Sequence, residues 1–171
     1  MADEDPPPVD DEYVLPTVPA SAGALISDRR GRLLILRPSY KSGWTIPGGV
    51  MESDGETPWQ ACRREVYEEC GLDVTEARLV CVDFRPPHAG NPGGIRFLFD
   101  CGSLGDAALD GITLQPGEIV EHRLVPVAEA LELLREPIRR RVSAVRRRDG
   151  RPRRGLVYLE NGRSVSAVRP S

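Results

Sequence analysis

Three glutamates close together on one expected helix are the residues best suited to chemistry. Glu65, Glu68 and Glu69 stand at positions i, i+3 and i+4, so a helix would place them on one face. Like charges at this spacing repel by roughly a few tenths of a kcal/mol per pair. Clustered carboxylate oxygens are typical ligands of Mg²⁺ or Mn²⁺, and a bound cation would remove the repulsion. A solvated, charged helix face is the alternative for this spacing taken alone.

The residues around this cluster predict how the helix begins and ends. Thr57 is suited to the N-cap, Pro58 to the first helical position, and Gln60 completes a capping box. Gly71 is suited to the C-terminal stop. Upstream, Gly48-Gly49 offers a backbone that a ligand can approach closely. Together these signals predict a metal and phosphate site built from a glycine pair and the following helix.

The whole segment resembles a known signature. Glu56, then seven residues, Arg64-Glu65-Val66, Glu68-Glu69 and Gly71-Leu72 are similar to the Nudix box of the Nudix hydrolases. The motif covers residues 48–72, and the order of expected elements extends the resemblance to about residues 15–160. One departure is the loop after the glycines, because six residues separate Gly49 from Glu56 where the family pattern has five. This longer loop puts the placement of the Gly48 carbonyl in question.

The resemblance implies an enzyme and assigns roles to the box residues. It implies a nucleotide pyrophosphatase that needs Mg²⁺, or alternatively Mn²⁺, and cleaves the pyrophosphate of a nucleoside diphosphate linked to another group. By motif position, the metal ligands would be Glu65, Glu68, Glu69 and the carbonyl of Gly48. Arg64 would orient the glutamates, and Glu56, Gly49 and Gly71 would support them.

The general base is left open between Glu65, Glu118 and Glu121. Nudix subfamilies differ in its position, and family members often place a functional glutamate near residues 118–121. We favour Glu118, because Gly117 before it predicts a loop able to reach the metals.

The substrate is less well determined by the sequence. Either a (d)NTP or an ADP-ribose-like nucleotide is compatible with the chain. Candidate residues for holding phosphate or stacking on a base are Arg37, Trp44, Arg85 and Arg96, together with Tyr40, Lys41 and His88.

Charge is distributed unevenly along the chain. Residues 1–134 carry 11 Lys and Arg against 23 Asp and Glu, whereas residues 135–171 carry 12 Arg against three acidic residues. The basic end predicts a solvated helix that pairs with the acidic body or with a second subunit in a homodimer. RNA is the alternative partner. Alternative functions are therefore an RNA 5′-end pyrophosphohydrolase or a non-catalytic, nucleotide-binding Nudix regulatory domain.

The length and composition predict one α/β (α+β) domain with a mixed sheet between helices. The chain has 171 residues, of which 40% are hydrophobic and 29% charged, and this composition excludes the fibrous and membrane classes of protein. The sequence has no secretory signal, which favours a cytoplasmic protein. Its four cysteines are therefore expected to be free thiols. Residues 1–14 are expected to be a disordered acidic arm, and 15–171 the Nudix domain. Strands are expected at 20–27, 33–36, 44–47, 78–84, 95–101, 118–125 and 156–159, and helices at 58–70, 126–134 and 137–148.

Overall fold

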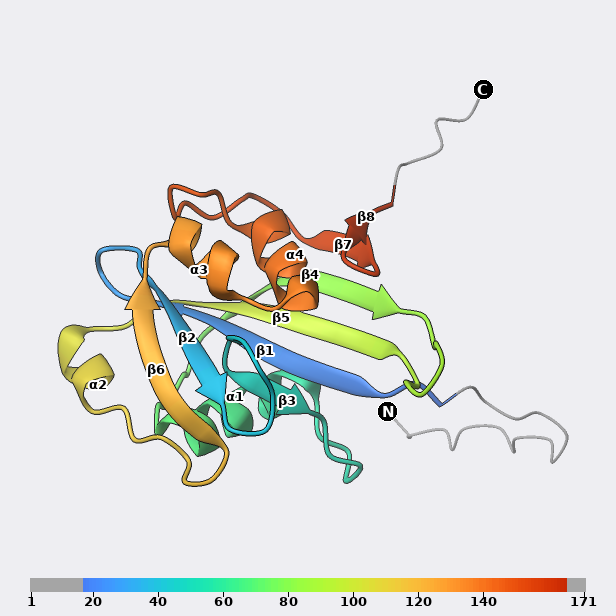
Figure 1. The fold of residues 1–171 in the computed structure, drawn as a ribbon, viewed down its shortest axis with the longest axis horizontal. Helices are drawn as coiled ribbons and strands as arrows, with labels where there is room; N and C mark the ends of the chain where they lie inside the picture. The colour runs from blue at the N-terminus through green and yellow to red at the C-terminus, as the bar shows by residue number, and fades with distance from the viewer. Residues whose placement is uncertain (1–16, 166–171) are drawn as a thin grey trace, which may run out of the picture.

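The computed structural model describes residues 17–165 and has a mixed sheet between two layers of helices (Figure 1). The predicted acidic arm at residues 1–14 lies outside the described part. The strands are β1 (Ala20–Ser27), β2 (Leu33–Pro38), β3 (Gly48–Val50), β4 (Arg78–Arg85), β5 (Gly94–Ser103), β6 (Ile119–Val125), β7 (Val157–Glu160) and β8 (Arg163–Ser164). The helices are α1 (Pro58–Cys70), α2 (Asp106–Asp110), α3 (Val127–Leu133) and α4 (Glu136–Val145). The predicted fold class is confirmed.

The strand order places β1 in the interior of the sheet, between β2 and β5. The order is β6-β2-β1-β5-β4-β7-β8, and β3 pairs with β1 off this path. The β1–β5 and β4–β7 pairs are parallel, and the other pairs are antiparallel. Gly23 of β1 pairs with Gly48 on one side and with Leu98 of β5 on the other. This register fixes the distance across the sheet between β3 and the residues of β5.

Two apolar clusters lie on opposite faces of the sheet. One joins the sheet to α3 and α4 and includes Leu25, Leu98 and Val142. The other joins the sheet to α1 and includes Cys62, Val66 and Phe99. Because both faces are covered, the largely buried strands β1 and β2 are nearly continuous apolar runs in the sequence.

Helix α1 begins and ends where its sequence signals predict. Thr57 accepts a hydrogen bond from the N–H of Gln60 at 3.2 Å, and the Gln60 side chain accepts one from the N–H of Thr57 at 2.8 Å. At the other end Gly71 adopts a left-handed conformation, with φ of 67°. The buried side chains of the helix include Val66 and also Glu69. The burial of a carboxylate was not predicted.

The last predicted helix is three residues too long, and a short helix was missed. Helix α4 ends at Val145 because Arg146 is extended (φ −119°, ψ 143°), and its guanidinium donates a hydrogen bond to Asp100 at 2.6 Å. Residues 102–117, where neither a helix nor a strand was predicted, contain the one-turn helix α2. All four cysteines are free, as predicted. No helix within residues 17–165 is long and apolar enough to cross a membrane.

Candidate active site

The glycine pair of β3 gives two α1 glutamates room against the strand. The N–H of Gly48 donates to a carboxylate oxygen of Glu69 at 2.8 Å. A Cβ at Gly49 would lie 2.3 Å from a carboxylate oxygen of Glu65, and a Cβ at Gly48 would lie 2.2 Å from the Ala22 carbonyl oxygen. Gly48, with φ of 139°, requires glycine because a side chain would meet backbone, whereas a side chain at Gly49 would displace the carboxylate of Glu65. Gly48 contacts the carboxylate of Glu69 through its backbone N–H.

Arg64 connects the glutamates of this segment to one another. Its guanidinium donates to Glu56 at 2.8 Å, to Glu65 at 3.0 Å and to Glu68 at 3.1 Å. It also reaches the carbonyl of Val50 at 3.1 Å. These bonds raise the pKa of Arg64, chiefly through Glu56, and lower the pKa of Glu56. The rigid fork of Arg64 thereby fixes the directions of three carboxylates.

Glu69 is the most perturbed acid of the site. Only 5% of its surface is exposed. Burial raises its pKa to about 8, and the charges of Glu65, Glu118 and Glu68 add to this rise against the opposing Gly48 hydrogen bond. Burial also raises the pKa of Glu65, although the Arg64 hydrogen bond opposes the change. A positive charge brought between these groups would offset the cost of ionising them.

This raised pKa predicts how stability depends on pH in metal-free protein. Glu69 is neutral in the folded state up to about pH 8, whereas its ordinary pKa is 4.5. The folded state therefore binds more protons between these values, so stability falls as pH rises from about 4.5 to 8. We expect urea unfolding in EDTA to follow this trend, and Glu69→Gln to flatten it. The lowered pKa of Glu56 has the opposite effect on stability, but only near and below its ordinary pKa of 4.5. Parallel pH curves for the two proteins would contradict the prediction.

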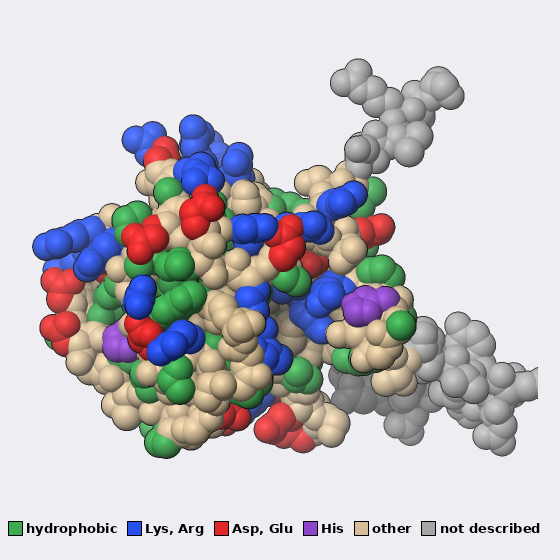
Figure 2. Space-filling view, viewed as in Figure 1, with side chains coloured by type: hydrophobic (Ala, Val, Ile, Leu, Met, Phe, Trp, Pro, Cys, Tyr) green, Lys and Arg blue, Asp and Glu red, His purple; other side chains and the backbone are tan. Residues whose placement is uncertain are grey.

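A cleft of about 510 Å³ joins these glutamates to a set of cations. Its walls come from β1, the loop before β3, α1, β4, β5 and α4 (Figure 1). Figure 2 shows Lys and Arg side chains gathered in the hollowed middle of this face. The charged residues that line the cleft are Glu65, Glu69 and Glu118, and Lys41, Arg85, Arg96, Arg135 and Arg141. One cleft thus contains an acidic end and several cations.

The donor set fits a hard divalent cation in its chemistry but not in a preformed geometry. Carboxylate oxygens are the ligands that Mg²⁺ and Mn²⁺ prefer, and among the ion pairs in the described part of the chain none includes the buried Glu69. Within residues 17–165, however, no three His, Cys, Asp or Glu side chains converge closely enough to hold a metal. The reason is visible in the contacts: Glu65 and Glu68 turn toward Arg64, while Glu69 turns toward Gly48.

Some of the other site residues predicted from the sequence line the cleft, and others lie outside it. Glu118 lines the cleft with Glu65 and Glu69, and so do Arg85 and Arg96, with Tyr40 and Lys41. Glu121 instead pairs with Arg37 at 2.9 Å on neighbouring strands, and neither residue lines the cleft.

Trp44 is a core residue. Its side chain is 7% exposed, and the guanidinium of Arg123 lies 4.7 Å from its ring centre. Trp44 belongs to the apolar cluster beneath α3 and α4 and does not line the cleft, so its ring is not available to stack on a base.

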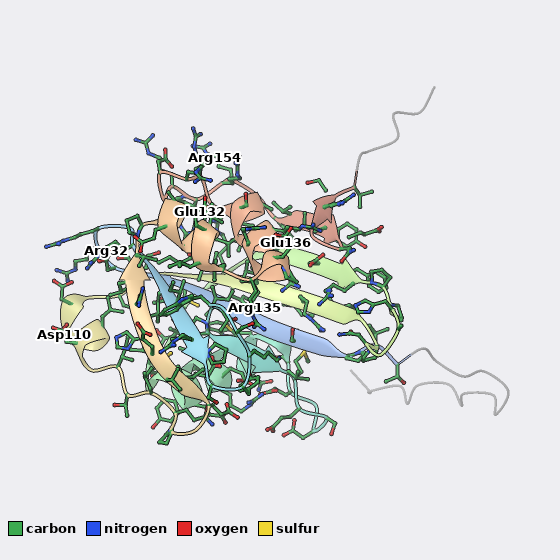
Figure 3. All side chains as sticks on the ribbon, in the orientation of Figure 1. Arg32, Asp110, Glu132, Arg135, Glu136 and Arg154 are labelled. Atoms are coloured by element: carbon green, nitrogen blue, oxygen red, sulfur yellow. The ribbon has the colours of Figure 1, made fainter. Side chains whose placement is uncertain are left out.

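Two cations of the cleft were not singled out from the sequence as substrate residues. Arg135 precedes α4 (Figure 3), and its N–H donates to the Trp44 carbonyl at 3.1 Å. Its buried Nε has no hydrogen-bond partner among residues 17–165. Arg141, also on the α4 segment, donates to the buried Asp83 at 2.7 Å. Both stand in an arginine-rich stretch, so composition alone could not separate them from their solvated neighbours.

Comparison with known families decides the assignment. The model described as NUDIX domain matches residues 17–145, about three quarters of the chain. The chain belongs to the Nudix family. Crystal structures of Nudix proteins agree: the MutT protein from Methanosarcina mazei Go1 superposes with a TM-score of 0.63 at 25% identity, covering 74% of this chain and 91% of that one. An Ap4A hydrolase from C. elegans has the same fold. It superposes with a TM-score of 0.56 at 23% identity and covers 74% of this chain and 96% of that chain.

Curated relatives of this Nudix chain match over shorter segments. An 8-oxo-dGTP diphosphatase of Proteus vulgaris is 40% identical over 74 residues, which is 39% of this chain and 65% of the relative. An RNA pyrophosphohydrolase of Mannheimia succiniciproducens is 40% identical over 60 residues, 35% of this chain and 30% of the relative. The chain thus spans less than two thirds of the length of each of these relatives.

Proposed function

We propose that this Nudix chain hydrolyses a pyrophosphate bond in nucleoside diphosphate derivatives, with a divalent cation held by Glu65, Glu68 and Glu69. The observation that carries the proposal is the buried Glu69, held by Gly48 in a cleft shared with Glu65 and Glu118. The carboxylates of Glu65, Glu69 and Glu118 repel one another when all are ionised, and a bound cation or a proton relieves this repulsion. The names of the relatives, an 8-oxo-dGTP diphosphatase and an RNA pyrophosphohydrolase, support the reaction class.

We assign a separate role in this reaction to each of several residues in and beside the cleft. A bound Mg²⁺ or Mn²⁺ supplies positive charge that stabilises charge developing on phosphate oxygens and lowers the pKa of an adjacent water. Arg64 holds Glu65 and Glu68 in place through the hydrogen bonds given above. Arg135 adds a fixed cation at the same end, beside Tyr40 and Glu118. Glu118 accepts the proton of the attacking water as the general base.

A substrate panel tests the reaction class. We expect turnover of at least one of a set of (d)NTPs, 8-oxo-dGTP, ADP-ribose, dinucleoside polyphosphates and 5′-triphosphate RNA, and we expect it to require Mg²⁺ or Mn²⁺. Phosphate and nucleotide products are measured by chromatography with and without EDTA. Metal-dependent binding without turnover on the whole panel would instead favour a regulatory nucleotide-binding domain.

RNA is included among the test substrates because the loop between α4 and β7 carries several exposed arginines. Arg147, Arg151, Arg153 and Arg154 line an open hollow of about 710 Å³ there, and Arg154 projects from the top of the view in Figure 3. Solvent-exposed arginines of this kind favour contact with a phosphate backbone. We expect Arg153→Gln with Arg154→Gln to weaken RNA binding in a salt-dependent way if RNA is the substrate. Turnover of mononucleotides should not change.

A further inference from the structure

Three arginines form a cluster in the part of the cleft that β4, β5 and α4 enclose. Arg85 of β4, Arg96 of β5 and Arg141 of α4 all line the cleft, and we call them the arginine cluster. Their single carboxylate partner is Asp83, which pairs with Arg141. Among the ion pairs within residues 17–165, none includes Arg85 or Arg96. The cluster therefore carries two more positive charges than its one acid balances.

The contacts of Arg96 leave its charge unbalanced. Its guanidinium donates to the carbonyls of Ile95 at 3.3 Å and Gly93 at 3.1 Å. Burial lowers its pKa, and the neighbouring charges of Arg141 and Arg85 lower it further. Holding three cations together in a partly buried place is unfavourable unless an anion completes the group.

The other well-buried arginines of the fold behave differently. Arg146, with 8% of its side chain exposed, donates to Asp100 at 2.6 Å, and Arg141, with 12% exposed, donates to Asp83 at 2.7 Å. Arg146, which lies outside the cleft, and Arg141, which lines it, thus each have a buried carboxylate partner. Arg96 lines the cleft without an ion pair to any described residue, because Asp83, which lies opposite it on β4, bonds Arg141 instead. This leaves the Arg96 guanidinium able to accept a ligand as its partner.

The sheet register gives the distance from this cluster to the glutamates. Gly48, Gly23 and Leu98 lie in one row across β3, β1 and β5, and Arg96 is two residues before Leu98 on β5. With strands about 4.8 Å apart and a rise of about 3.3 Å per residue, the Cα atoms of Gly48 and Arg96 are about 12 Å apart. The guanidinium of Arg96 turns back along β5 toward Gly93, so a ligand that contacts both Arg96 and the glutamates must extend over a length of about this size, with a phosphate at each end of one nucleoside.

We propose that the arginine cluster binds a second phosphate, one nucleoside away from the pyrophosphate, so that the substrate is a nucleoside diphosphate derivative with a further phosphate on its ribose. The assignment of the pyrophosphate to the glutamate end rests on the proposed function. The cluster itself does not depend on turnover. Arg85, Arg96 and Arg141 supply charge-assisted hydrogen bonds to the ribose phosphate, and Asp83 positions Arg141 through its Nε.

Binding of product-like ligands tests the cluster without any hydrolysis. The ligands are adenosine 3′,5′-bisphosphate, adenosine 2′,5′-bisphosphate and AMP, titrated calorimetrically into the full chain with Mg²⁺ at about 0.15 M salt, where non-specific attraction is screened. We expect one bisphosphate to bind about tenfold more tightly than AMP. Arg96→Gln should abolish this preference, and Arg96→Lys should retain part of it. Arg148→Gln removes an exposed charge outside the cleft and should leave the preference unchanged.

Two outcomes would overturn the inference. One is equal affinity of the native chain for AMP and both bisphosphates, and the other is an equal loss in Arg96→Gln and Arg148→Gln. Melting curves establish that each variant is folded. Turnover is then compared for coenzyme A against dephospho-coenzyme A, and for NADP⁺ against NAD⁺. If the chain hydrolyses other nucleotides but shows no preference for a bisphosphate over AMP, the proposed function is supported and the assignment of the arginine cluster is wrong. If it prefers a bisphosphate but hydrolyses no nucleotide, the assignment of the cluster is supported and the proposed function is wrong.

Discussion

Glu69→Gln is expected to lower metal-dependent hydrolysis by about a hundredfold or more, since the change removes a proposed direct metal ligand and even outer partners of metal sites contribute about 10- to 100-fold. The fold should persist. The Gln side chain keeps an oxygen that can accept the Gly48 N–H, which Glu69 accepts at 2.8 Å. The residue is also neutral in metal-free folded protein at pH 7, because its pKa is raised to about 8. Steady-state rates at saturating Mg²⁺, with melting temperatures alongside, measure both effects.

Glu76→Gln is the matched control for this variant. It makes the same change of charge at an exposed position in the segment after α1, outside the cleft. We expect its rate to stay within about twofold of the native value, because exposed substitutions away from such sites have small effects. Equal rates for the native chain and Glu69→Gln would remove Glu69 from the metal site.

Arg141→Gln is expected to destabilise the fold by about 3 kcal/mol, since removing one partner of a buried ion pair leaves the other charge unpaired. Asp83 is 1% exposed, and its two oxygens accept from Arg141 at 2.7 Å and from the N–H of Gly162 at 2.8 Å. The substitution leaves only the Gly162 bond. Urea unfolding measures the loss, and adding Asp83→Asn to Arg141→Gln should recover part of it by removing the uncompensated charge.

Arg148→Gln is the control in this case. Arg148 pairs with Glu132 at 2.9 Å, with 67% and 68% of the two side chains exposed. Solvent screens such a pair, so its loss should cost at most about 0.5 kcal/mol. Similar costs for the two variants would mean that the Asp83–Arg141 pair is not a structural link between α4 and β4.

The basic end of the chain therefore contains two kinds of arginine. Arg141 and Arg146 pair with buried acids of the sheet, which agrees with the predicted pairing of the basic helix with the acidic body. Arg147 and Arg148 are exposed, and their ion pairs within residues 17–165 are to Asp149 and Glu132 on the surface. The predicted solvated face is thus correct for part of the cluster and wrong for Arg141 and Arg146. Periodicity does not reveal which arginine meets a buried acid on a distant strand.

Helix α1 could be predicted almost completely from the sequence, because its determinants are local. The capping box, the C-terminal Gly71 and the i, i+3, i+4 spacing of the glutamates act within one helix and its flanks. The glycines before the helix were also singled out from the sequence. The reason for them, a close approach of Glu65 to Gly49 and of Glu69 to Gly48, needed the packing of α1 against β3.

The sequence by itself determined the family, the α1 carboxylates and the approximate order of strands and helices. Only the tertiary structure decided that Glu69 is the buried member, that Trp44 belongs to the core, and that Glu118 rather than Glu121 lines the cleft. It also brought Arg135 and Arg141 to the cleft from a segment more than sixty residues beyond α1. The physical reason is that burial and charge pairing depend on which distant elements pack together, whereas caps and helix faces depend on near neighbours in the chain.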